Sequence, residues 1–203
     1  MAHSFETLIA MSPAALEDVL NANKAPAFSS LVAHEFRGWN VFGDALAKGV
    51  GTVMGIQRFA KGFFLRDAPV GGVDDAAAID ALTFIEGYNV KIRRGTKDEP
   101  WTAIPDDARP TRHSYYRVER AHEGAERKGR HPEALLLDYS QGIPKPGLFE
   151  GSGLRDFVVS VDGNPDLLLG KAYMTIGPVT SAVGFFVAER LRQVDPLAWR
   201  STT

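Results

Sequence analysis

Residues 154–190 read LRDFVVSVDGNPDLLLGKAYMTIGPVTSAVGFFVAER, three apolar runs separated by two turn signals. The first signal, Asp162 to Asp166, combines Asp, Gly, Asn and Pro, the residues that β-turns favour for their backbone conformations. The second contains Gly177 and Pro178. Short turns between apolar runs indicate strands that pair antiparallel with their neighbours. We therefore predict three consecutive strands, over residues 154–161, 167–176 and 182–190.

Alternation of apolar and polar residues, the period of a half-buried strand, is clearest in residues 82–93. Most apolar side chains of this segment, including Tyr88 and Val90, fall at even-numbered positions and would share one face. Comparable runs occur on both sides of it and raise the number of predicted strands to eight. These further strands are expected over residues 31–41, 58–65, 113–119 and 134–139.

The main helical signals lie in the first thirty residues, with one or two further turns possible over residues 44–48. Ser12 and Pro13 form a favourable helix start, with Ser at the N-cap and Pro at the first helical position. No long helix separates the predicted strands, which argues against a parallel α/β sheet. A sandwich and a closed barrel remain, and closure removes the exposed edges that successive strands would otherwise carry. We predict a mainly β fold: a closed antiparallel barrel of about eight or more strands, a short N-terminal helix, and no helix above about 14 residues.

The chain has 203 residues, a formal net charge of −2 and no cysteine. Its length suits one domain, in which we expect a helical segment (1–30), the barrel (31–190) and a C-terminal tail (191–203). The near-neutral charge gives no electrostatic reason to expect nucleic acid as a partner. The N-terminus lacks the basic start of a signal peptide, and no apolar run approaches about 18 residues. We therefore expect no transmembrane segment and a cytoplasmic location.

Two segments carry a family resemblance: Phe36-Arg37-Gly38-Trp39-Asn40 and Phe185-Phe186-Val187-Ala188-Glu189-Arg190. They resemble the first and last strands of the lipocalin and wider calycin superfamily. The stretch 166–172 is also similar to the penultimate strand of bacterial lipocalin-like proteins of unassigned function. The resemblance implies that Trp39 lies beneath the barrel and that Arg190 crosses over its ring by cation–π attraction. Gly38 directly precedes Trp39, whereas the family leaves one residue between them, so the alternative is that Trp39 points into the cavity.

No catalytic or metal-binding motif is present. The chain has five histidines and no two of them are closely spaced: His3, His34, His113, His122 and His131. A haem pocket of the nitrobindin kind would place its proximal histidine later in the chain than any of these. Gly151-Ser152-Gly153 lacks the strand–helix elbow of a serine hydrolase, and no P-loop or dinucleotide-binding motif occurs. We predict no catalytic residue, no metal site and no cofactor.

The aromatic residues give the best indication of a site. They fall on separate predicted strands, and barrel closure would bring several to one interior. An apolar cup with a few polar groups suits a small molecule. The predicted ligand-binding residues are Tyr88, Tyr116, Tyr139, Lys171, Tyr173 and Phe186. The alternative is that these side chains only fill the core. A glycine-rich segment within 41–65 would form a movable portal at the mouth.

The favoured function is binding of a small apolar or amphipathic molecule inside the barrel, without catalysis. Two alternatives stay open. In the first, the barrel is an isomerase or hydrolase for a lipid-like or polyketide-like substrate, and a Tyr–Lys or Tyr–His pair transfers a proton. In the second, the barrel is solid and its surface binds another protein.

Overall fold

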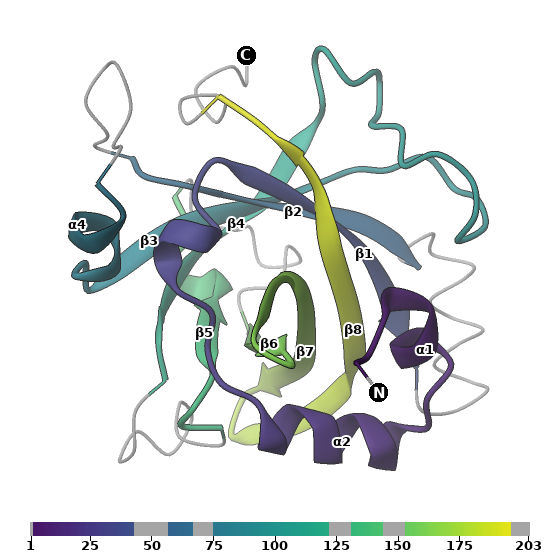
Figure 1. The fold of residues 1–203 in the computed structure, drawn as a ribbon, viewed down its shortest axis with the longest axis vertical. Helices are drawn as coiled ribbons and strands as arrows, with labels where there is room; N and C mark the ends of the chain where they lie inside the picture. Colours follow the sequence, from purple (N-terminus) through teal and green to yellow (C-terminus); the bar gives the residue numbers. More distant parts are fainter. Residues whose placement is uncertain (1, 43–56, 67–74, 122–130, 144–152, 196–203) are drawn as a thin grey trace.

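The computed structural model describes residues 2–42, 57–66, 75–121, 131–143 and 153–195 (Figure 1). Its helical elements are α1 (Phe5–Ile9), α2 (Pro13–Ala22), α4 (Ala76–Asp80) and the short 3₁₀ turns η1 (Phe28–Ser30) and η2 (Tyr139–Gln141). Its strands are β1 (His34–Val41), β2 (Arg58–Phe64), β3 (Phe84–Val90), β4 (Arg112–Arg120), β5 (Leu135–Asp138), β6 (Leu154–Val161), β7 (Asn164–Ile176) and β8 (Val179–Gln193).

The strands form a closed antiparallel barrel. Each strand pairs with the next along the chain, and β8 returns to pair with β1. This closing seam runs from His34 opposite Gln193 to Val41 opposite Phe185. The predicted fold is confirmed, and a barrel of this kind is compatible with a calycin-like fold. The longest helix in the described ranges, α2, has ten residues, within the predicted limit.

The turn between β6 and β7 is tighter than the sequence indicated. Asp162 and Gly163 both have positive φ, 54° and 69°. These are the conformations of a two-residue hairpin turn whose twist matches that of the flanking strands. Since two residues suffice for the turn, β7 begins at Asn164, inside the stretch predicted as a loop. The last strand is also longer than predicted and continues to Gln193.

Both faces of the barrel wall are apolar. Opposed residues in an antiparallel pair point to the same side, so the register assigns each residue to the interior or the outer surface. The interior cluster takes side chains from all eight strands, from Phe36 on β1 to Phe186 on β8. A second cluster, which includes Tyr88 and Val90, lies on the outer surface. Leu16 and Leu20 of α2 and Trp101 of the β3–β4 connection belong to this outer cluster and cover part of it.

The N-terminal helices lie outside the barrel: α1 packs against β8 and β1, and α2 packs against β6 to β8 (Figure 1). Helix α2 begins as predicted: the Ser12 side chain accepts a hydrogen bond from the Ala15 amide, and Pro13 occupies the first turn. In the part of the chain that the structure describes, no helix is long and apolar enough to cross a membrane.

One end of the barrel is closed by η1. Phe28 of η1 is fully buried in the interior cluster. The Arg190 guanidinium crosses this end: it lies 5.5 Å from the centre of the Phe36 ring and donates to the Ser30 carbonyl oxygen at 2.8 Å. It also pairs with the Asp166 carboxylate.

The expected stack of Arg190 on Trp39 does not form. Arg190 lies opposite Phe36 in the β1–β8 register, whereas Trp39 lies opposite Val187. Because neighbouring positions on a strand point to opposite faces, Trp39 is on the outer surface, packed against the outer cluster. Phe36 therefore takes the place beneath the guanidinium that the family resemblance assigned to Trp39.

Replacing Arg190 tests this closure. We expect Arg190→Ala to lower the free energy of unfolding by about 1–2 kcal/mol, because it removes the ring contact and the bond to Ser30. Arg190→Lys should recover only part of this loss, since an ammonium lacks the planar stacking face. Urea unfolding followed by circular dichroism measures both variants. The exposed Arg93→Ala serves as control and should change stability by less than about 0.5 kcal/mol; equal losses for Arg190→Ala and Arg93→Ala would contradict the assignment.

Candidate functional site

Interior-facing residues become less buried along the barrel axis. At the η1 end, interior residues such as Phe36, Val118 and Leu135 are fully buried. At the opposite end, where β1 ends and β2 begins, interior-facing residues are half exposed. We call this end the mouth and define it by Asn40, Phe59, Asn89, Leu154, Ala172 and Gly184. Interior-facing residues are therefore less buried at the mouth than at the η1 end.

A buried lysine lies below the mouth. The Lys61 side chain comes from β2 and is only 5% exposed. Its Nζ donates to three oxygens: the Tyr139 hydroxyl at 2.5 Å, the Asp156 carboxylate at 3.0 Å and the Asn89 side-chain carbonyl at 3.2 Å. All three ammonium protons thus have an acceptor, which is the condition for keeping a charge out of water.

The carboxylate of Asp156 is only half satisfied. Its Oδ2 accepts from Lys61 and from the Tyr139 hydroxyl, the latter at 3.1 Å. Its Oδ1 is buried and has no hydrogen-bond partner among the described residues. A buried acceptor left without a donor costs about 1–3 kcal/mol. Oδ1 is therefore the atom of this site that gains most from an added donor.

Aromatic rings surround the ammonium group. Its nitrogen lies 5.0–5.3 Å from the centres of the Phe59, Tyr116, Tyr139 and Phe186 rings. These distances are within the range of cation–π attraction. Three of the rings lie flat against a glycine directly opposite on the neighbouring strand, where a β-carbon would overlap the ring: Phe59 on Gly38, Tyr116 on Gly87 and Phe186 on Gly170.

Burial shifts the titration of the groups in the interior. Desolvation lowers the pKa of Lys61, and the Asp156 carboxylate opposes that shift. Desolvation, followed by the charge of Asp156, raises the pKa of Tyr116 and of Tyr139 well above the ordinary value. Both phenols are therefore protonated at neutral pH and act as hydrogen-bond donors. Tyr139 donates to Asp156, while Tyr116 faces the backbone carbonyl oxygen of Tyr88 at 3.3 Å.

The structure brings three of the six predicted ligand-binding residues into the interior: Tyr116, Tyr139 and Phe186. It places Tyr88, Lys171 and Tyr173 on the outer surface. Tyr88 donates there to the buried Glu35 carboxylate at 3.0 Å, and Lys171 pairs with Glu17 of α2. Tyr173 contacts the His131 ring nitrogen at 3.0 Å. These three residues attach covering segments or satisfy buried charges outside the barrel.

Sequence reasoning missed Lys61, Asn89 and Asp156. Lys61 and Asp156 stand in strands with apolar neighbours, at positions that share a face with Phe63 and Val158. A charged residue on the apolar face of a strand is the signal that could have identified them, because burial of such a residue requires a partner.

Some expectations fall outside the described residues or have no counterpart in them. Most of the glycine-rich segment expected to form a portal, from Gly43 to Gly55, is not described. Among the described residues, no group of three or more His, Asp or Glu side chains is placed to hold a metal ion.

Comparison with family models, with curated proteins and with solved structures finds no match to this chain.

Removing one partner of the buried Lys61–Asp156 ion pair should lower the free energy of unfolding far more than removing both. Lys61→Met leaves Asp156 charged and unpaired, and we expect it to lower the free energy of unfolding by about 3–5 kcal/mol. The double variant Lys61→Met/Asp156→Leu should recover most of that loss, because no buried charge remains. Urea unfolding measures both.

The control is Lys171→Met, which breaks a partly exposed ion pair on the outer surface and should cost about 0–1 kcal/mol. If Lys61→Met cost no more than this control, the buried pair would not contribute as described.

Proposed function

We propose that the protein binds a small amphipathic molecule in the mouth half of the barrel and releases it unchanged. The observation that carries this proposal is the change in burial along the barrel: interior-facing residues at the mouth are less buried than those at the η1 end, and below them lies a carboxylate oxygen with no donor among the described residues. Pockets for small molecules combine an apolar lining with a few placed polar groups in this way.

The polar groups indicate which end of the ligand would lie deepest. Asp156 Oδ1 requires a donor, so the inner end of the ligand carries a hydroxyl, amide or amine proton. Phe59 and Leu154 at the mouth supply half-exposed apolar surface for the body of the molecule. Asn40 and Asn89 add polar contacts at the same level. The proposed ligand is thus apolar along its length and has a hydrogen-bond donor at one end.

Catalysis by a Tyr–Lys pair is the second candidate, and one contact favours it. The Lys61 Nζ and the Tyr139 hydroxyl oxygen lie 2.5 Å apart. However, the three protons of the Lys61 ammonium already have acceptors, and the Tyr139 hydroxyl already donates to Asp156. A proton-transfer role would require these bonds to exchange during the reaction. We therefore rank non-catalytic binding first, and the lipocalin-like assignment stays a prediction.

A blocking substitution tests the proposed site. Ala172 faces the interior at the mouth and is half exposed, whereas Ala182 on the same hairpin is exposed. We expect Ala172→Trp to weaken binding of a fluorescent fatty-acid alcohol analogue about tenfold or more, equivalent to about 1.4 kcal/mol, because the indole occupies the path to Asp156.

The matched control, Ala182→Trp, should change the affinity less than about twofold. Fluorescence titration gives both affinities, and thermal unfolding checks that both variants fold. Absence of binding across a panel of chain lengths, or equal affinities in the two variants, would contradict interior binding.

A further inference from the structure

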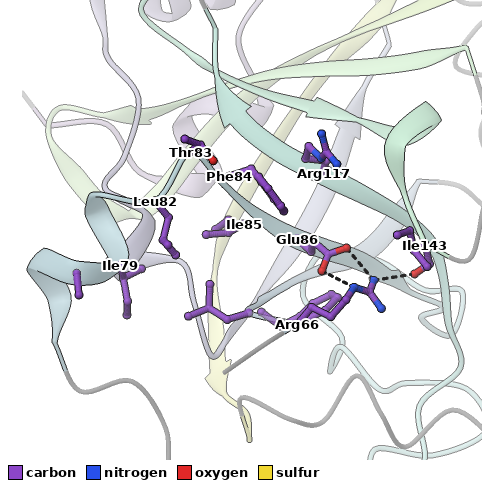
Figure 2. A pocket seen from close by; sticks show the side chains of 12 residues that line it. Arg66, Ile79, Leu82, Thr83, Phe84, Ile85, Glu86, Arg117 and Ile143 are labelled. Atoms are coloured by element: carbon purple, nitrogen blue, oxygen red, sulfur yellow. Dashed lines mark hydrogen bonds and ion pairs between the residues drawn. The ribbon is translucent and has the colours of Figure 1, made fainter. Parts of the chain in front are cut away.

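A pocket lies at the barrel end that η1 closes, and its lining includes Ile79 and Ile85 of the interior cluster. It has a volume of about 380 Å³ and is bounded by α4, by the end of β2 and by the start of β3. Figure 2 shows Ile79 and Leu82 on the α4 side of this pocket and the Arg66–Glu86 pair on the other side. Its volume is in the range of small-molecule sites, which begins at about 300 Å³.

The pocket concentrates apolar surface that the fold does not cover. Leu82 and Phe84 are each 41% exposed, and Ile143 is 52% exposed, and all three line it. Single exposed apolar residues are common on proteins, whereas these three line one concavity. A ligand with an apolar body would bury this surface.

One cation of the pocket is already neutralised. The Arg66 guanidinium makes two hydrogen bonds of 2.7 Å to the two oxygens of Glu86, and a third of 3.1 Å to the Ile143 carbonyl (Figure 2). This bidentate pair fixes one wall and leaves neither group available to a ligand.

The second cation, Arg117, has a different environment. Its guanidinium stacks on the Phe84 ring at 4.4 Å and makes no ion pair with any residue that the structure describes. Asp138, which lies opposite it in the β4–β5 register, instead accepts from Ser140 and faces Arg155. Glu86, opposite Arg117 on β3, is engaged by Arg66. Among the described residues, the lining therefore has two guanidinium groups and one carboxylate beside an apolar concavity.

We propose that this pocket binds an amphipathic monocarboxylate, with its hydrocarbon part between α4 and β3 and its carboxylate on Arg117. Stacking on Phe84 holds the planar guanidinium, which leaves its edge N–H groups to donate to both carboxylate oxygens. This site uses none of the residues that define the mouth and neither Lys61 nor Asp156, so it goes beyond the proposed function and is tested separately from it.

The experiment compares octanoate with octanamide, which has the same chain length and no charge. Both are titrated by isothermal calorimetry into the Ala172→Trp protein, in which the interior path is blocked. We expect octanoate to bind more tightly than octanamide. Arg117→Gln should weaken octanoate about fivefold or more and leave octanamide unchanged, since only the charge contact is lost. Arg117→Lys should retain part of the preference, and the exposed Arg93→Gln should retain all of it.

Each result has one meaning for the proposal. A preference for octanoate that depends on Arg117 and survives in Arg93→Gln supports it. Equal binding of the two ligands, or a preference that Arg117→Gln does not reduce, overturns the assignment of Arg117. No heat from either ligand overturns the pocket as a binding site. Ala78→Phe, which adds a ring to the pocket wall, gives an independent check, because it should weaken both ligands if they occupy this concavity. Interior binding of the fatty-acid alcohol analogue is measured in the unblocked protein and is unaffected by any of these outcomes.

Discussion

Pairing of β8 with β1 satisfies the last open edges of the sheet and separates one set of side chains from solvent. Lys61 and Asp156 are 95 positions apart and come from strands that are not neighbours in the sheet. They meet only because the closed sheet curves β2 and β6 toward a common axis. The aromatic residues around them are held in place by the same curvature. An open sheet would leave the ammonium in water and the rings without opposing surface.

The order of the strands and the closure could be predicted from the sequence, because turn residues and two-residue periodicity are local signals. Which face of each strand would point into the barrel could not be predicted from the sequence. On β3, the regular apolar face that contains Tyr88 and Val90 is the outer one, covered by Trp101 and its neighbours. The interior face of the same strand has Ile85, Gly87 and Asn89. Periodicity separates the two faces of a strand. When both faces are covered and apolar, it does not show which of them points into the barrel.

The candidate site was only partly predictable for a related reason. Tyr116 and Tyr139 could be assigned to an interior by their positions on separate strands, whereas the residues that give the interior its polarity form bonds across the barrel. Lys61 on β2 is satisfied by Asn89 on β3, by Tyr139 after β5 and by Asp156 on β6. Pairing among four segments depends on register and curvature, and neither quantity can be read from one segment. The same holds for Phe36 beneath Arg190.

The glycine–ring pairs inside the barrel tie the choice of residue on one strand to that on its neighbour. Gly170 has no space for a β-carbon while Phe186 lies on it, and the same relation joins Gly87 to Tyr116. In any related sequence, a larger residue at position 170 would therefore require a smaller one at 186, so these positions should covary. Evolution could then enlarge or reshape the interior volume by exchanging whole pairs, a route that leaves strand order and closure untouched.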